Sequence, residues 1–189
     1  MQDRFRVELL GKEELVEPKY VKPFKVNYLE NGIKKDWEVV EVHDSVSILL
    51  YDESKEKLLL VKQVRPAIFL KDGVGITYEL CAGILDKNKS SLEIASEEIE
   101  EETGYRVKPS EIERITKFYT SVGFAGSGQE LFFAKIDDSK KLHKGGGVED
   151  ENIELFYLDV DDIDDFIFDE TKIKTPGLLF ALTYFKLIK

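Results

Sequence analysis

The chain has 189 residues, of which 42% are hydrophobic and 11% aromatic, and its formal net charge is −11. These values are typical of a globular protein with one main domain, and they exclude an intrinsically disordered chain. The acidic balance argues against a protein that binds duplex nucleic acid, because such a protein needs a basic face to displace counterions.

The sequence carries no signal for a membrane protein or a secreted protein. Its apolar runs, such as residues 58–61, have the length of strands, and residues 1–6 lack the apolar stretch of a signal peptide. Cys81 is the only cysteine, which excludes an internal disulfide and fits a reducing compartment. We therefore expect a cytoplasmic protein without membrane contacts.

A short antiparallel β unit is predicted near the start of the chain. Residues 24–29 alternate between apolar and polar side chains, residues 30–32 (Glu-Asn-Gly) are a turn signal, and residues 35–42 return as a second strand. We expect residues 1–43 to form this unit and residues 44–189 to form the main domain. Because such a hairpin is too short to hold a core alone, we expect it to dock onto a partner subunit in a homodimer.

The main domain is predicted to begin with further strands. Residues 46–51 and 57–63 flank a polar turn and predict a second hairpin, and residues 76–81 predict another strand. A helix follows at about residues 91–103, because a capping-box sequence precedes it and a glycine ends it.

The rest of the chain continues this mixture. Strands are expected at residues 112–120, 130–135 and 153–158, and a proline-started amphipathic helix at residues 175–188. The polar, glycine-dense segment 137–151 is long and irregular, which is common for functional loops. This order predicts an α/β (α+β) fold with a mixed β-sheet sandwiched between helices.

The predicted helix at residues 91–103 has an unusual crowding of glutamates. They are Glu93, Glu97, Glu98, Glu100, Glu101 and Glu102. Their place near the carboxyl end opposes the helix dipole, and the like-charged pair Glu98/Glu102 costs roughly 0.2–0.5 kcal/mol in an isolated helix. A divalent cation would relieve the repulsion, since hard cations bind carboxylate oxygens. The alternative is a charged face exposed to solvent.

The surrounding sequence resembles the Nudix box, in which a glycine-led loop and a glutamate-rich helix bind metal on a diphosphate. The matching residues are Gly83, Glu98, Ile99, Glu101, Glu102, Gly104 and Tyr105. Two positions depart from the family pattern. Lys89 stands where the family has its first glutamate, and Glu97 stands where it has an arginine that usually orients a ligand glutamate.

Segments outside the box resemble the UDP-sugar pyrophosphatase branch of that family. They lie at residues 43–46, 61–67, 78–83 and 145–149. The resemblance implies hydrolysis of a nucleoside diphosphate sugar, with UDP-glucose giving UMP and glucose 1-phosphate. Two alternatives stay open: an ADP-ribose or ADP-sugar pyrophosphatase, and a catalytically weakened protein that binds nucleotide sugars. Ser121-Val122-Gly123 lacks the proline of the Ser-Pro-Gly found in ADP-ribose pyrophosphatases, which favours the UDP-sugar branch.

The same resemblance assigns roles to metal and catalytic residues. The Ala82 carbonyl, Glu98 and Glu102 are the implied ligands of Mg²⁺ or Mn²⁺, with Glu101 as a further ligand or catalytic partner. The general base of this branch comes from a loop after the box. Glu151 is the first candidate and Glu149 the second, whereas the alternative for both is an exposed acidic loop.

Three residues are candidates for substrate binding. Arg65 follows a strand, where its guanidinium could fork onto phosphate oxygens, and Glu79 could hold a ligand or this arginine in place. Relatives stack the base on an aromatic residue of the first hairpin, often across a dimer, and Trp37 is the candidate here. The alternatives are a surface salt bridge for Arg65 and plain strand packing for Trp37. Cys81 is expected to be a small core residue.

Overall fold

The computed structural model of the chain describes residues 5, 7–13, 15–17, 21–148 and 151–188. Its strands are β1 (Lys22–Glu30), β2 (Ile33–Glu41), β3 (Ser45–Asp52), β4 (Lys57–Val64), β5 (Ile76–Glu79), β6 (Cys81–Ile84), β7 (Ile112–Thr120), β8 (Ser127–Ile136), β9 (Glu154–Asp159) and β10 (Ile173–Lys174). Its α-helices are α1 (Pro66–Asp72), α2 (Ser91–Glu98), α3 (Ile163–Phe168) and α4 (Pro176–Ile188). The hairpins and strands expected in chain order are confirmed, apart from the differences described below.

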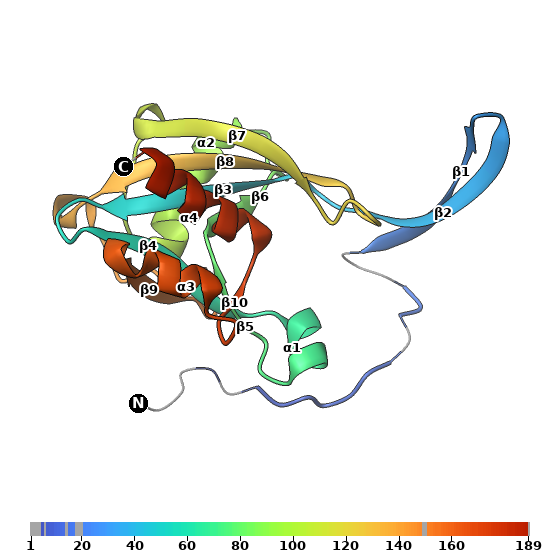
Figure 1. Cartoon of the computed structure of the whole chain (residues 1–189), viewed down its shortest axis with the longest axis horizontal. Coiled ribbons are helices and arrows are strands. Elements are labelled where there is room, and N and C mark those ends of the chain that lie inside the picture. Colours follow the sequence, from blue (N-terminus) through green and yellow to red (C-terminus); the bar gives the residue numbers. More distant parts are fainter. Residues whose placement is uncertain (1–4, 6, 14, 18–20, 149–150, 189) are drawn as a thin grey trace.

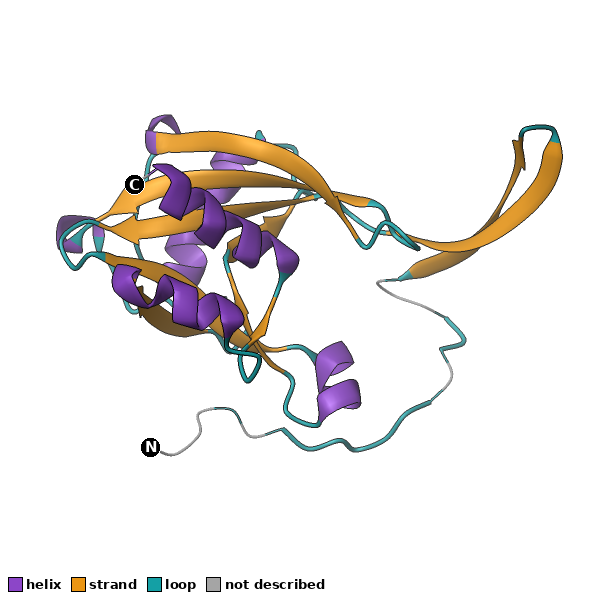
Figure 2. Ribbon diagram, in the orientation of Figure 1, coloured by secondary structure: helices purple, strands orange, loops and turns teal. Residues whose placement is uncertain are grey.

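The main sheet is mixed, as the sequence predicts. Within the described residues it has eight strands, in the order β10-β5-β4-β3-β8-β7, with β6 paired to β3 and β9 paired to β4. The pairs β3/β8 and β10/β5 are parallel, and the other pairs are antiparallel. Helices α3 and α4 lie on one face of the sheet and α2 on the other (Figures 1 and 2).

Successive side chains of the central strands point to opposite faces of the sheet, and each face carries its own hydrophobic core. Val46, Ile48 and Leu50 of β3 belong to the core under α2, whereas Leu49 and Tyr51 belong to the core under α3 and α4. Successive side chains of a strand point to opposite faces, so one apolar strand supplies both cores. The prediction of a sheet sandwiched between helices is therefore confirmed.

The first hairpin lies apart from this sandwich. Strands β1 and β2 form a two-stranded antiparallel sheet that projects from the body of the molecule (Figure 1). Every residue of β1 is exposed. The backbone N–H of Val40 donates to the Phe124 carbonyl at 2.8 Å, which ties the base of the hairpin to the loop between β7 and β8.

Two local features differ from the sequence prediction. The strand expected at residues 76–81 is divided at Leu80, because β5 pairs with β4 whereas β6 pairs with β3. Helix α1 was not expected. It begins with Pro66 in its first turn and ends at Gly73, whose φ of 78° is in the left-handed region.

The acidic helix also changes character along its length. Ser90 caps α2 through a capping box with Glu93, as predicted, but the helix continues from Ile99 to Thr103 as a π-helix. Gly104 ends it with a φ of 74°. Single π-helical turns occur frequently at functional sites, and this one carries Glu101 and Glu102. No helix of the described part of the chain is long and apolar enough to span a membrane.

Candidate active site

Strand β6 lies directly against the acidic helix. A Cβ atom on Gly83 would overlap the carboxylate of Glu98, so any other residue here would displace this side chain from its position. One residue earlier, the backbone N–H of Ala82 donates to Oε2 of Glu102 at 3.2 Å. The spacing of the box therefore brings its loop and two of its glutamates into contact.

The surroundings of Glu98 and Glu102, the two glutamates nearest β6, disfavour their negatively charged forms. Burial raises the pKa of Glu102 to about 8, and the negative charges of Glu98 and Glu151 add to this rise. Burial also raises the pKa of Glu98 to about 7, together with the charges of Glu101 and Glu151, although Lys87 partly opposes the rise. Such carboxyls bind a cation favourably, because the cation replaces the lost hydration and removes the mutual repulsion.

A glycine loop wraps the carboxyl end of the π-helix. Gly146 N–H donates to the Glu102 carbonyl at 2.8 Å, and Gly147 N–H donates to the Glu101 carbonyl at 3.2 Å. Both glycines have positive φ, 118° and 85°, where other residues are strained. The loop thereby satisfies carbonyl groups that a helix end leaves without partners, and it brings the following residues to the site.

Glu151 is fixed by this loop. Its Oε2 accepts a hydrogen bond from Val148 N–H at 3.1 Å, and a Cβ on Gly147 would lie only 2.6 Å from that same oxygen. Its charge acts on Glu98, Glu102 and Arg65. Glu149, the second candidate for the base, lies outside the described residues.

Arg65 and Glu79 form a bidentate ion pair beside these carboxylates. Nε of Arg65 donates to Oε1 at 2.7 Å, and Nη2 donates to Oε2 at 2.6 Å. Thr77 Oγ1 donates to the same Oε1 at 2.6 Å, which fixes the carboxylate from the strand side. The carboxylate of Glu79 raises the pKa of Arg65, so the arginine remains a cation. The guanidinium is thereby held near the carboxylates of Glu102 and Glu151, whose charges also raise the pKa of Arg65.

The remaining glutamates of the helix have partners of their own. Glu93 accepts from the Ser90 backbone N–H at 2.8 Å as part of the capping box. Glu100 pairs with Arg106 through two hydrogen bonds of 3.0 Å. Glu97 pairs with Lys89 and Lys87. These contacts leave Glu98 and Glu102, which lie against β6, and Glu101, which lines a cavity together with Gly147 and Val148 of the glycine loop.

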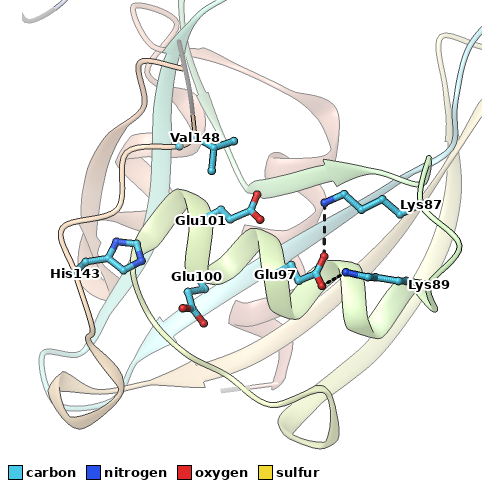
Figure 3. Close-up of a pocket in the computed structure, with 8 residues that line it drawn as sticks. Lys87, Lys89, Glu97, Glu100, Glu101, His143 and Val148 are labelled. Carbon is cyan, nitrogen blue, oxygen red and sulfur yellow. Dashed lines mark hydrogen bonds and ion pairs between the residues drawn. The ribbon is translucent and has the colours of Figure 1, made fainter.

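Glu101 lines a cavity of about 520 Å³ on the outer side of the helix (Figure 3). The other side chains of this cavity include Lys87, Lys89, Glu97 and His143. A second cavity, of about 280 Å³, contacts Glu79 and Ala82 from the opposite side of the sheet. Residues of the candidate site therefore line two separate cavities.

The donor set fits a hard divalent cation, although the described residues contain no group of three His, Cys, Asp or Glu side chains already arranged to hold one. The fit rests on chemistry: Glu98 and Glu102 supply carboxylate oxygens, their pKa values are raised by burial and repulsion, and Glu101 is adjacent. Oxygen ligands of this kind suit Mg²⁺ or Mn²⁺.

The structure does not bring Trp37 to the carboxylates. Its side chain is 57% exposed on the hairpin, and its indole N–H donates to the Gly123 carbonyl at 2.6 Å. Gly123 belongs to the loop between β7 and β8. Cys81, by contrast, is fully buried in the core under α2, as expected of a small core residue.

Two residues of the candidate site, Thr77 and Lys87, were not identified from the sequence. Thr77 stands two residues before Glu79, and this period-two spacing in a strand was a usable signal for a shared face. Lys87 gave no such signal, because its contacts depend on how the loop between β6 and α2 folds back. The glycines of the segment 137–151 were noted, but not their hydrogen bonds to the helix end.

Comparison with known proteins identifies the family. The family model of the NUDIX domain matches residues 41–176. Uridine diphosphate glucose pyrophosphatase NUDT14 of Bos taurus is 36% identical, over 88% of this chain and 88% of the relative. The same protein of Mus musculus is 33% identical over the same shares. GDP-mannose pyrophosphatase of Cronobacter sakazakii is 37% identical, over 80% of this chain and 81% of the relative. The chain is therefore a member of the Nudix hydrolase family.

Proposed function

We propose that this protein hydrolyses the diphosphate bond of a nucleoside diphosphate sugar, and that UDP-glucose is converted to UMP and glucose 1-phosphate. The observation that carries the proposal is the gathering of Glu98, Glu102 and Glu151 beside the Arg65–Glu79 pair. The two kinds of relatives reported above are both named as pyrophosphatases of nucleotide sugars, which supports this substrate class.

We assign the metal to the Ala82 carbonyl, Glu98 and Glu102, with Glu101 as a further ligand. When bound, Mg²⁺ or Mn²⁺ neutralises charge on the diphosphate and lowers the pKa of an attacking water. The contact between Glu98 and Gly83 and the hydrogen bond between Ala82 and Glu102 hold the loop and helix together at this point. The carboxylates are thereby pre-positioned on rigid elements, which a ligand set requires.

Arg65 is assigned to the phosphate oxygens of the substrate. Its Nε and Nη2 are held by Glu79, so the planar guanidinium is fixed before the substrate arrives. A fixed cation costs less ordering entropy on binding than a flexible one. Glu79, supported by Thr77, acts in this account as the residue that orients Arg65.

Glu151 is assigned as the general base. It takes a proton from water as the water oxygen bonds to phosphorus and the bridging P–O bond breaks, which leaves UMP and the sugar phosphate. Its fixed position on the glycine loop and its charge coupling to Glu98 and Glu102 support this role. Glu149 remains the second candidate.

The homodimer is also part of the proposal. The hairpin β1–β2 carries exposed apolar side chains, among them Phe24, Tyr28 and Trp37, and it lies away from the body of its own subunit (Figure 1). A partner subunit would bury this surface, and Trp37 could then stack on a base across the interface. We place the protein in the cytoplasm, because its one cysteine is a buried free thiol.

The substrate proposal is tested by incubating the protein and Mg²⁺ with a panel of UDP-glucose, other UDP-sugars, GDP-mannose, ADP-sugars and ADP-ribose. Phosphate released after addition of phosphatase reports turnover. We expect the highest kcat/KM with UDP-glucose or a close UDP-sugar. Faster turnover of ADP-ribose or GDP-mannose would overturn the choice of substrate, and tight binding without any turnover would identify a binding protein instead.

A further inference from the structure

The two departures from the Nudix box lie against each other. Lys89, at the position of a family glutamate, forms an ion pair with Glu97, at the position of a family arginine. Lys87 Nζ lies 3.6 Å from the other carboxylate oxygen of Glu97 (Figure 3). The two positions therefore carry opposite charges, and each charge has the opposite sign to that of the family pattern.

These three side chains fasten the loop between β6 and α2 to the helix. The loop begins after Ile84, which ends the strand that supplies Ala82 and Gly83, and it leads to the capped start of α2 at Ser90. Glu97 immediately precedes Glu98, the residue that packs on Gly83. The ion pairs thus hold the loop against the helix at Glu97, and the contact with Gly83 holds the preceding strand against the helix at the next residue, Glu98.

The electrostatics of the cluster agree with this arrangement. The hydrogen bond from Lys89 holds the pKa of Glu97 below its usual value. Although partial burial opposes it, the carboxylates of Glu101, Glu97 and Glu98 raise the pKa of Lys87. One exposed ion pair contributes little by itself, but two lysines on one carboxylate form a network. Lys87 also places a cation next to two candidate metal ligands, Glu98 and Glu101.

We propose that Glu97 is a positioning residue, which with Lys89 and Lys87 forms a charge-reversed clamp that holds Glu98 against Gly83 in the metal site. The inference rests on the proposed function, because it concerns the ligands of that metal. An arginine at position 97 would face Lys87 and Lys89 without a partner. Restoring the family residue at one position alone should therefore damage the site, and restoring both should repair it.

The test is a double-mutant cycle on Mg²⁺ binding without substrate. Glu97→Arg, Lys89→Glu and the double variant Lys89→Glu/Glu97→Arg are titrated with Mg²⁺ by calorimetry. We expect each single substitution to weaken Mg²⁺ binding by about three-fold to ten-fold, and the double variant to recover most of that loss. Lys89→Arg keeps the charge and should bind Mg²⁺ as the unmodified protein does.

A matched control uses the pair Glu100–Arg106, in which Glu100 lies on the same helix and Arg106 follows its end, and which is held by its own hydrogen bonds. Glu100→Arg, Arg106→Glu and their double variant should leave Mg²⁺ affinity unchanged. Circular dichroism checks that every variant is folded, and Glu97→Gln replaces any that is not. This neutral variant should also weaken Mg²⁺ binding.

The outcomes separate the two proposals. If the unmodified protein binds Mg²⁺ and the single variants bind it equally well, the clamp has no positioning role. The same conclusion follows if the double variant binds no better than the weaker single variant. If the unmodified protein binds no Mg²⁺ at all, the proposed function itself is overturned, and the inference with it.

Discussion

The backbone N–H of Ala82 donates to Oε2 of Glu102 across 3.2 Å, so the strand that leads into the box loop is tied to the end of the acidic helix. Glu102 has only 6% of its surface exposed, and burial raises its pKa to about 8. Ionising a buried carboxyl costs free energy unless a nearby cation balances its charge. We assign this role to the metal.

Replacing Glu102 should lower the activity of the protein without lowering the stability of its metal-free form. Glu102→Gln keeps the shape and an acceptor for the Ala82 N–H, but it removes an ionisable group whose charged form is disfavoured by burial. We expect turnover to fall by about a hundredfold or more, because a metal ligand is lost. The metal-free variant should be at least as stable as the unmodified protein near neutral pH. Assays of kcat and thermal unfolding check both expectations.

The control for this substitution is Glu100→Gln. Glu100 is on the same helix but pairs with Arg106 at the surface, so turnover should change little. Full turnover by Glu102→Gln would contradict the ligand role.

Stability without metal should decrease as the pH rises. The folded pKa values of Glu98 and Glu102, about 7 and about 8, lie above the ordinary value of 4.5. The folded state therefore holds protons more tightly than the unfolded state. This contribution to the free energy of unfolding is complete below the ordinary value, decreases as the pH rises, and is lost above about 8. We expect the Tm in the presence of a chelator to fall between about pH 5 and about pH 8.5.

Mg²⁺ should reverse this trend, because it binds the ionised carboxylates. The rise in Tm on adding Mg²⁺ should be larger at about pH 8 than at about pH 6. Glu102→Gln should show a smaller loss of Tm with pH in chelator. A Tm that is independent of pH in the metal-free protein would count against the burial of ionisable acids at this site.

The bidentate contact between Arg65 and Glu79 makes a lysine a poor substitute. Arg65→Lys keeps the charge but cannot make both hydrogen bonds, so we expect KM for the nucleotide sugar to rise about tenfold. Glu79→Gln should raise KM less, because the guanidinium is only misdirected. Steady-state kinetics measure these effects, and Arg106→Lys is the surface control. If Arg65→Lys left KM unchanged, Arg65 would be a structural ion pair only.

Glu151 should affect kcat more than metal binding. Glu151→Gln removes the proposed base, and we expect kcat to fall about 10²- to 10⁴-fold while the protein still binds Mg²⁺. Glu154→Gln is the matched control, because Glu154 pairs with Lys62 at 3.0 Å on the adjacent strand. A larger loss in Glu149→Gln than in Glu151→Gln would transfer the role of base to Glu149.

Local signals in the sequence predicted much of the fold and part of the site. The capping box of Ser90 and Glu93 set the start of α2, and the two runs on either side of a polar turn predicted the strands β3 and β4. The four-residue spacing of Glu98 and Glu102 indicated a shared surface, and both now lie against β6. Such features depend on neighbours within one turn or one strand, so the sequence contains them directly.

Features that depend on distant contacts were not predictable in this way. The π-helix from Ile99 to Thr103 lies where Gly146 and Gly147 bind its carbonyl groups, and these residues are more than forty positions away. Glu97 was an unexplained acid in the sequence, and only the folded loop places Lys87 and Lys89 beside it. The position of Trp37 also depends on contacts made beyond its own hairpin.

The central claim is that metal-dependent hydrolysis cleaves the diphosphate of a nucleotide sugar. The most direct measurement is chromatographic identification of the products from UDP-glucose, with Mg²⁺ and with a chelator. The account predicts UMP and glucose 1-phosphate in equal amounts with Mg²⁺, and neither product with the chelator. Equal turnover in both conditions, or release of UDP and free glucose, would contradict it.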